Sequence, residues 1–258
     1  MDGDLFDSTI PFGAPELMRA ASYRRYLDEL PFDTTGSGTG TRLSHLSPSL
    51  QADLLRFDAG DGNGNGNGDG LDAVQVLAAC LRHASRLTIH LQCAGHVVPL
   101  TVFAPEQQVH CPMDLGELVE RHLAGLRVMH VEPAQWQPPD GPQLALVDAA
   151  HRCQPLAPLL WELALRGPRR DLLPEIGGPA VYRVAPGLDM SALPASGALK
   201  AAVQRLRRQA ANLTEIGGWP ALDRERAARL LNALYLQAGL IVSRSHPSAV
   251  RESWFGGL

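Results

Sequence analysis

Histidine and cysteine side chains, which commonly bind zinc, gather in the middle of the chain. Five of them fall within 22 residues: His90, Cys93, His96, His110 and Cys111. A zinc site needs four ligands that converge on the ion at about 2.0–2.3 Å. The residues from Leu87 to Cys93 alternate as a strand does, so side chains three apart, like direct neighbours, point to opposite faces. We therefore expect no zinc site, with Cys93 facing a core and the histidines at the surface.

Oxygen-bearing side chains form a second pattern in the glycine-rich stretch AGDGNGNGNGDG at residues 59–70. Together with the residue at 72, they fall at the ligand positions of a twelve-residue calcium loop: Asp61, Asn63, Asn65, Asn67, Asp69 and Asp72. The stretch resembles an EF-hand, which implies calcium. It differs where Asp72 replaces the bidentate glutamate and where Gly68 replaces an aliphatic residue. Alternating Asn-Gly pairs also arise in low-complexity repeats, so the main prediction is a flexible linker, with calcium as the alternative.

Motifs of nucleophilic and phosphate chemistry are missing from the sequence. It contains no G-x-S-x-G, H-E-x-x-H, Walker A or G-x-G-x-x-G pattern. Lys200 is the only lysine, against 22 arginines, so one residue alone could form a Schiff base. The arginine excess indicates a GC-rich coding bias and hence a bacterial protein. We predict a protein without catalysis or cofactor; an enzyme with an unrecognised site is the alternative.

Charge is distributed unevenly along the 258 residues, whose net charge is −4. Residues 1–80 carry 5 arginines against 12 acidic residues, whereas residues 198–258 carry 9 basic residues against 4 acidic ones. A basic tail can contact nucleic acid. An acidic front and a basic tail can equally contact each other, and both interpretations stay open.

Location is predicted from two absences. The opening MDGDLFDST lacks the basic and then apolar layout of a secretory signal. No run approaches the 18 or more apolar residues of a membrane span. We expect a cytoplasmic protein with reduced cysteines and no membrane partner.

Hydrophobic periodicity predicts the elements that would position these residues. Helical patterns fall near 15–30, 43–57, 71–83, 114–126, 144–151 and 156–166. Strand patterns fall near 86–93, 97–103, 107–112, 127–133 and 180–184, and AGH at 94–96 is expected to be the turn of a hairpin between the first two strands. The expected fold class is α+β, a small antiparallel or mixed sheet with covering helices. Pro99 lacks an amide donor, which places its strand at an edge or a bulge. The expected divisions are an N-terminal helix and loop (1–42), an α+β domain (43–135), a mainly helical domain (144–250) and a mobile tail (251–258).

The C-terminal part shows the most regular pattern. A helix is expected at 198–213, then the brief TEIGGW, a helix at 223–238 that Asp223 caps, and a strand at 240–244. Over about 198–250 this order resembles the winged-helix superfamily. The resemblance implies that 223–238 is a recognition helix, and it implies a set of DNA-facing side chains: Arg224, Arg226, Arg229 and, on the wing, Arg244. Asp223 and Glu225 depart from the pattern, because carboxylates at the start of that helix repel phosphate.

These observations favour a bacterial regulatory or adaptor protein that acts through protein–protein contacts. Its expected contact surfaces are the edge strand near Pro99 and the aromatic pair Trp254 and Phe255 near the C-terminus. The alternative is a DNA-binding transcription regulator that uses the four arginines of the winged-helix-like module.

Overall fold

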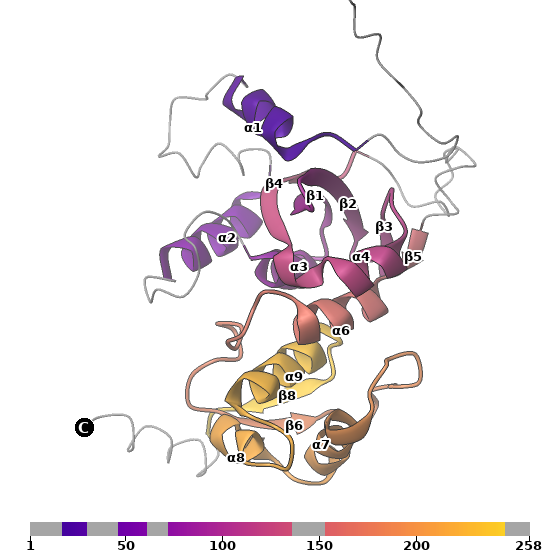
Figure 1. Ribbon diagram of the computed structural model, residues 1–258. Coiled ribbons are helices and arrows are strands. Elements are labelled where there is room, and N and C mark those ends of the chain that lie inside the picture. Colours follow the sequence, from indigo (N-terminus) through magenta and orange to yellow (C-terminus); the bar gives the residue numbers. More distant parts are fainter. Residues whose placement is uncertain (1–16, 30–45, 61–71, 136–152, 246–258) are drawn as a thin grey trace, which may run out of the picture.

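The computed structural model in Figure 1 describes residues 17–29, 46–60, 72–135 and 153–245. Helices lie against a five-stranded and a three-stranded sheet, so the predicted α+β class is confirmed. A helix predicted at 144–151 lies outside the described residues. Among the described residues, no helix combines the length and the apolar character needed to cross a bilayer.

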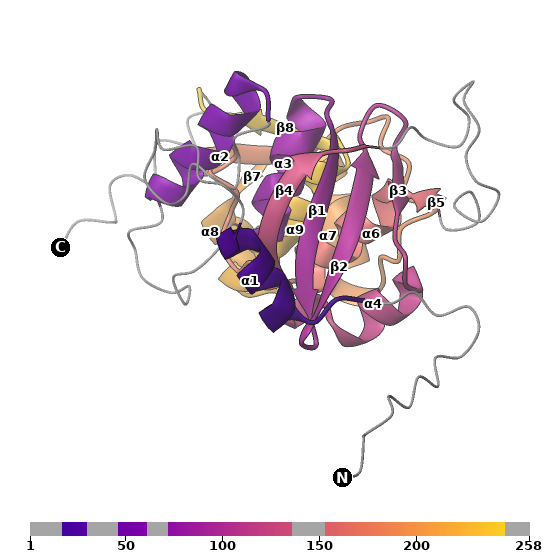
Figure 2. The same ribbon diagram turned by 90° about the horizontal axis from the view of Figure 1, so that it is seen from above.

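The larger sheet has the order β4-β1-β2-β3-β5 and is antiparallel throughout (Figure 2). Its strands are β1 (Arg86–Cys93), β2 (His96–Phe103), β3 (Gln108–His110), β4 (Arg127–Pro133) and β5 (Cys153–Pro155). The predicted hairpin of β1 and β2 turns at Ala94 and Gly95, whose φ angles of 47° and 84° are both positive. Two positive φ angles match the twist of the strands in a two-residue hairpin turn.

Strand β2 was predicted at an edge of the sheet or beside a bulge, but as a whole it does not lie at an edge. It is the central strand of the five, and the two edges are β4 and β5. Pro99 is tolerated there because β3 pairs with β2 only from Thr101 onward. The missing amide donor therefore falls in a stretch of β2 without a β3 partner. Among the described strands, β2 is thus paired only with β1 at Pro99, and the ladder between β1 and β4 has an irregularity next to His90, the residue paired with Pro99.

Helices cover the inner face of this sheet, drawn below it in Figure 1. They are α2 (Pro48–Gly60), α3 (Ala73–Arg82), α4 (Leu115–Arg121), a 3-10 turn (Leu123–Gly125) and α6 (Leu156–Arg166). Helix α6 packs against α3 and α4 on one side and against the C-terminal helix α9 (Arg224–Leu236) on the other. One hydrophobic core consequently runs from Leu46 to Leu236, across the boundary that the sequence suggested between two domains.

The outer face of the sheet carries α1 (Ala20–Glu29), drawn above the strands in Figure 1 and in front of them in Figure 2. Ala20 and Tyr23 of this helix form a small separate core with Val97 and Met129. The Tyr23 ring stacks on the His90 ring at 5.1 Å between centroids. Alternation along β1 thus directs His90 to α1, while its neighbours Ile89 and Leu91 enter the main core.

The C-terminal module, residues 181–243, contains a three-stranded antiparallel sheet of order β7-β6-β8. Besides α9, its elements are β6 (Val181–Val184), α7 (Gly197–Arg208), β7 (Ala211–Asn212), α8 (Leu213–Gly217) and β8 (Leu240–Ser243). Strand β8 pairs with β6, which precedes α7 in the chain. The sequence order α7, α8, α9, β8 agrees with the predicted order of helices and strand.

The end of one helix was predicted wrongly. The pattern extended it to residue 213, but α7 ends at Arg208 because Gln209 is extended, with φ −138° and ψ 146°. Asn212 then begins α8: its side chain accepts from Glu215 N at 2.8 Å, and the Glu215 carboxylate accepts from Asn212 N at 3.0 Å. This reciprocal capping box assigns Leu213 to the next helix.

Candidate protein-binding surface

Arg229, predicted to face outward from α9, is anchored within the protein. Its Nη1 donates to the carbonyl oxygens of Leu165 and Gly167, each at 2.9 Å, and its side chain is 14% exposed. Its Nε donates to Glu225 Oε1 at 3.0 Å. The two carbonyls lie at the end of α6, where such groups have no partner within the helix. Arg229 therefore joins α9 to α6.

The other three predicted arginines are exposed but differ in their contacts. Arg226 donates from Nη1 to Ala221 O at 2.7 Å, across the turn before α9. Arg244 donates from Nη2 to Glu175 O and Gly177 O at 2.9 and 3.1 Å. Arg224 is exposed, and no carboxylate of the described residues pairs with it. The four arginines thus do not form one set of equivalent, outward-facing groups.

Asp72, the last residue of the possible calcium loop, is engaged elsewhere. Its Oδ1 accepts from Val74 N at 2.9 Å and caps α3. Its Oδ2 accepts from Arg169 Nη1 at 2.7 Å. Both carboxylate oxygens therefore have structural partners. The remaining calcium candidates, and the aromatic candidates at the C-terminus, lie outside the described residues: Asp61, Asn63, Asn65, Asn67, Asp69, Trp254 and Phe255.

The histidines and cysteines occupy different environments. Cys93 is buried on the core face of β1, as predicted. His110 was expected at the surface and is instead buried, 7% exposed, because β3 lies between β2 and β5. His90 is half-buried, and its Nε2 lies 3.0 Å from Glu132 Oε1. In the part of the chain that the structure describes, no three His, Cys, Asp or Glu side chains are grouped as metal ligands would be.

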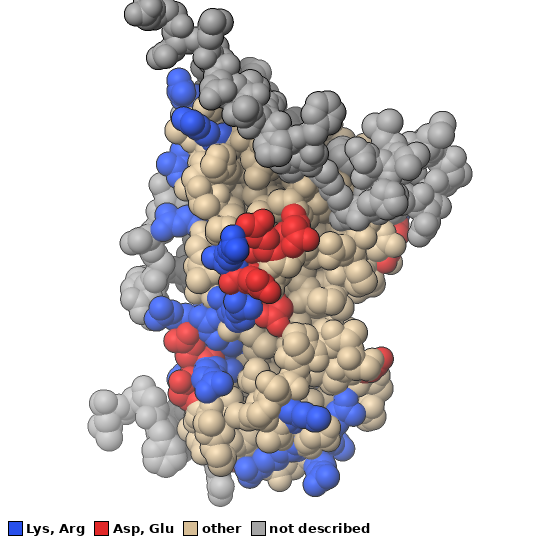
Figure 3. Space-filling model, turned by 45° about the vertical axis from the view of Figure 1, so that its right-hand side comes forward, with Lys and Arg blue, Asp and Glu red and all other residues tan. Residues whose placement is uncertain are grey.

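Helix α7 carries the basic face of the C-terminal module. From Lys200 onward, its exposed residues recur at i, i+1, i+4, i+5 and i+8, one side of a helix. They are Lys200, Ala201, Gln204, Arg205 and Arg208. Figure 3 shows basic side chains gathered at the end of the molecule that this module forms. Helix α7 and its C-cap, GALKAAVQRLRRQ, contain no acidic residue, so no i,i+4 ion pair can form along it.

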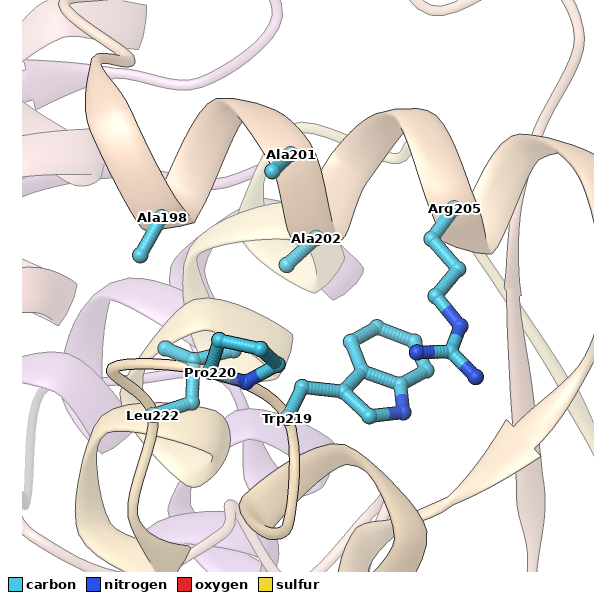
Figure 4. Close-up of a pocket in the computed structure, with 7 residues that line it drawn as sticks. All are labelled: Ala198, Ala201, Ala202, Arg205, Trp219, Pro220 and Leu222. Atoms are coloured by element: carbon cyan, nitrogen blue, oxygen red, sulfur yellow. The ribbon is translucent and has the colours of Figure 1, made fainter.

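A small groove lies beside this basic face, between α7 and the turn that joins α8 to α9 (Figure 4). Methyl groups of α7 form one wall, and the turn forms the other. The lining residues are Ala198, Ala201, Ala202, Arg205, Trp219, Pro220 and Leu222, and the volume is about 130 Å³. A cavity of about 150 Å³ accommodates a benzene ring, so this groove fits one large apolar side chain.

Arg205 completes the groove at its rim. Its guanidinium carbon lies 4.4 Å from the centroid of the Trp219 ring, within the range of a cation–π contact. The contact holds the charge at the groove while leaving the side chain exposed. Among the described residues, no carboxylate pairs with Arg205, whereas Arg121 and Arg166 each pair with a glutamate one turn away. The site therefore offers an apolar pocket and an unneutralised cation.

Sequence reasoning did not find this groove. The sequence indicated a basic C-terminal part and a helical pattern at 198–213, but neither feature predicts a pocket. The signal lay in three alanines on one flank of a helix and in the Trp219–Pro220 pair of the next turn. Their proximity depends on how α7 packs against α8 and α9, which the local pattern does not encode.

Comparison with known proteins found no matching family model, no matching curated protein and no matching solved structure. The function proposed below therefore depends on the geometry and chemistry of this surface.

Proposed function

We propose that this chain is a non-catalytic bacterial regulatory or adaptor protein that binds another protein in the cytoplasm through the α7 groove. The observation that carries the proposal is the pairing of an apolar groove of about 130 Å³ with Arg205, held over Trp219 at its rim. Aromatic and arginine side chains around a well-shaped pocket are typical of the residues that dominate protein–protein binding. The order α7, α8, α9, β8 supports a winged-helix-like module used here as a binding scaffold.

Site-specific photocrosslinking tests the proposal in the cell of origin. A benzoylphenylalanine at position 208 lies one turn along α7 from Arg205, beside the groove without filling it, and the same group at position 204 lies on the exposed face of α7 farther from the groove. Position 208 should trap one dominant protein, which position 204 should not. Adding Ala198→Leu, which fills the groove, should abolish that adduct. Equal adducts at both positions, or an adduct that survives the filling, would exclude the groove as the binding site.

A second candidate function is DNA binding by the winged-helix-like module. The observation that favours it is the presence of exposed cations without described ion-pair partners on both α7 and α9, Arg205 and Arg224 among them. Arg229 would contribute no phosphate contact, because its guanidinium is bound to α6. A gel-shift titration tests this function, since log K should fall with log salt at about −0.9 per neutralised phosphate. Absence of binding to excess duplex at low salt would exclude it.

A further inference from the structure

The α7 groove and the N-terminal segment have complementary chemistry. No basic residue precedes Arg19 in the sequence, whereas four acidic residues do. Within that segment, residues 4–7 read Asp-Leu-Phe-Asp and place two large apolar side chains between two carboxylates. We propose that residues 4–7 of a second copy of this chain dock in the groove, with Phe6 in the apolar pocket and an aspartate against Arg205.

The size of the groove selects a single ring-sized side chain. Its volume of about 130 Å³ is close to that of a cavity that holds one benzene ring. Ala201 and Ala202 supply only methyl groups to one wall, so the space between α7 and Pro220 is left for an incoming residue. The Trp219 ring borders the same space and can pack edge-to-face or offset against a phenylalanine.

Charge selects an acidic segment. Arg205 is fixed beside the pocket by its contact with Trp219, and Lys200 and Arg208 lie on the same exposed side of α7. No carboxylate of the described residues pairs with these three cations. An aspartate on either side of Phe6 would supply the missing negative charge. A DNA backbone would satisfy the charges but has no apolar side chain for the pocket.

Chain reach favours docking between two copies over docking within one. The described chain begins at Leu17 next to α1, on the outer face of the larger sheet, while α7 lies at the opposite end of the molecule (Figure 1). Nine residues lie between Asp7 and Leu17, so the ten steps from one to the other span at most about 35 Å. Several packed layers, each about 10 Å thick, lie between the two sites. Docking in trans joins two different surfaces and is therefore a head-to-tail contact.

This contact would regulate partner binding at the groove, and this part of the inference rests on the proposed function. A partner protein that uses the same pocket must displace Phe6 of the neighbouring copy before it can bind. Association of the chain with itself and binding of the partner would then exclude each other at α7. The docking itself needs no partner and can be tested without one.

Fluorescence anisotropy tests the docking with a labelled peptide of residues 1–12 and the full chain carrying Phe6→Ser, which removes the competing ring. Saturable binding is expected, weakened about tenfold or more by Ala201→Trp, which fills the groove, and by Arg205→Glu, which reverses its charge. Gln204→Trp and Arg224→Glu are matched controls outside the groove and should change affinity less than about threefold. All four positions are exposed or partly exposed, and circular dichroism checks that the variants fold.

Sedimentation of the unaltered full chain completes the test. Association that rises with protein concentration and is lost in Phe6→Ser and in Ala201→Trp is expected. Peptide binding that is equal in all variants, or absent up to about 1 mM peptide, overturns the docking. A chain that stays monomeric while the peptide binds overturns docking between copies. Photocrosslinking at position 208 can still trap another protein when the peptide fails to bind, so the failure of this inference and that of the proposed function are distinguishable.

Discussion

Replacing Asp72 should destabilise the fold through two separate contacts. Its Oδ1 caps α3 at Val74 N, and loss of an N-cap costs about 1 kcal/mol. Its Oδ2 accepts from Arg169 Nη1 at 2.7 Å, where the side chains are only 19% and 9% exposed. A hydrogen bond between charged groups contributes about 1.5–3 kcal/mol. Asp72→Ala should therefore lower the free energy of unfolding by about 2–4 kcal/mol.

Asp72→Asn separates the two contributions, because asparagine caps helices well but carries no charge for Arg169. Urea unfolding should place this variant between the wild type and Asp72→Ala. Thermal unfolding should show the same order, with Asp72→Ala melting roughly 4–16 °C below the wild type. A free energy of unfolding for Asp72→Ala within about 0.5 kcal/mol of the wild type would refute the reasoning. Added calcium should not restore the midpoint, since both oxygens of Asp72 already have partners within the protein.

Three further changes test other parts of the structure. Arg229→Ala should lower the free energy of unfolding in urea by about 2–3 kcal/mol, because it leaves two carbonyls at the end of α6 without their charged donor. Arg224→Ala, at an exposed position, should lower it by less than about 0.5 kcal/mol, and equal effects of the two changes would contradict the role of Arg229. Asn232→Leu should cost about 2–4 kcal/mol, since Asn232 is fully buried and its Oδ1 accepts from Leu173 N at 2.9 Å; an unchanged midpoint would show that this buried N–H finds another acceptor. Burial raises the pKa of the Cys80 thiol from 9.0 to about 12, so this thiol ionises first in the unfolded chain and the free energy of unfolding should fall as pH rises from about 9 to 12. Relative to Cys80→Ala, the wild type should lose about 2 kcal/mol between pH 8 and 10.5. Parallel pH profiles of the two proteins would contradict this.

The sequence predicted elements whose signals are local. Helix α6 has the predicted bounds 156–166, because its apolar residues begin at Leu156 and Gly167 follows its last residue directly. The β1–β2 hairpin was predicted for the same reason, since strand alternation and the turn at Ala94 and Gly95 are contiguous in the chain. Asp223 was predicted to cap α9, and its side chain accepts from Arg226 N at 2.7 Å.

Partners distant in the chain could not be predicted. Asp72 and Arg169 are 97 residues apart, and Arg229 is 64 residues from Leu165. Nothing in the local periodicity of either segment specifies which side chain will approach it after folding. Asp72, in a calcium-like spacing, and Arg229, on a helix that resembles a DNA-reading helix, both make contacts that stabilise the fold. The position of β2 inside the sheet escaped prediction likewise, because β3 and β5 return from later in the chain.

The basic residues of the C-terminal module divide into two groups once their partners are known. Arg229 and Arg244 donate to main-chain carbonyls of the protein itself, so their charge stabilises helix ends and loops. Arg205 instead stacks on Trp219 and is exposed, and α7 has no acidic residue to neutralise it. Total charge therefore overstates the capacity of the module to bind a polyanion and says little about where binding would occur. The charges of Lys200, Arg205 and Arg208 on α7 and of Arg224 on α9 are left for an external ligand. The groove beside α7 favours a ligand that also presents an apolar side chain.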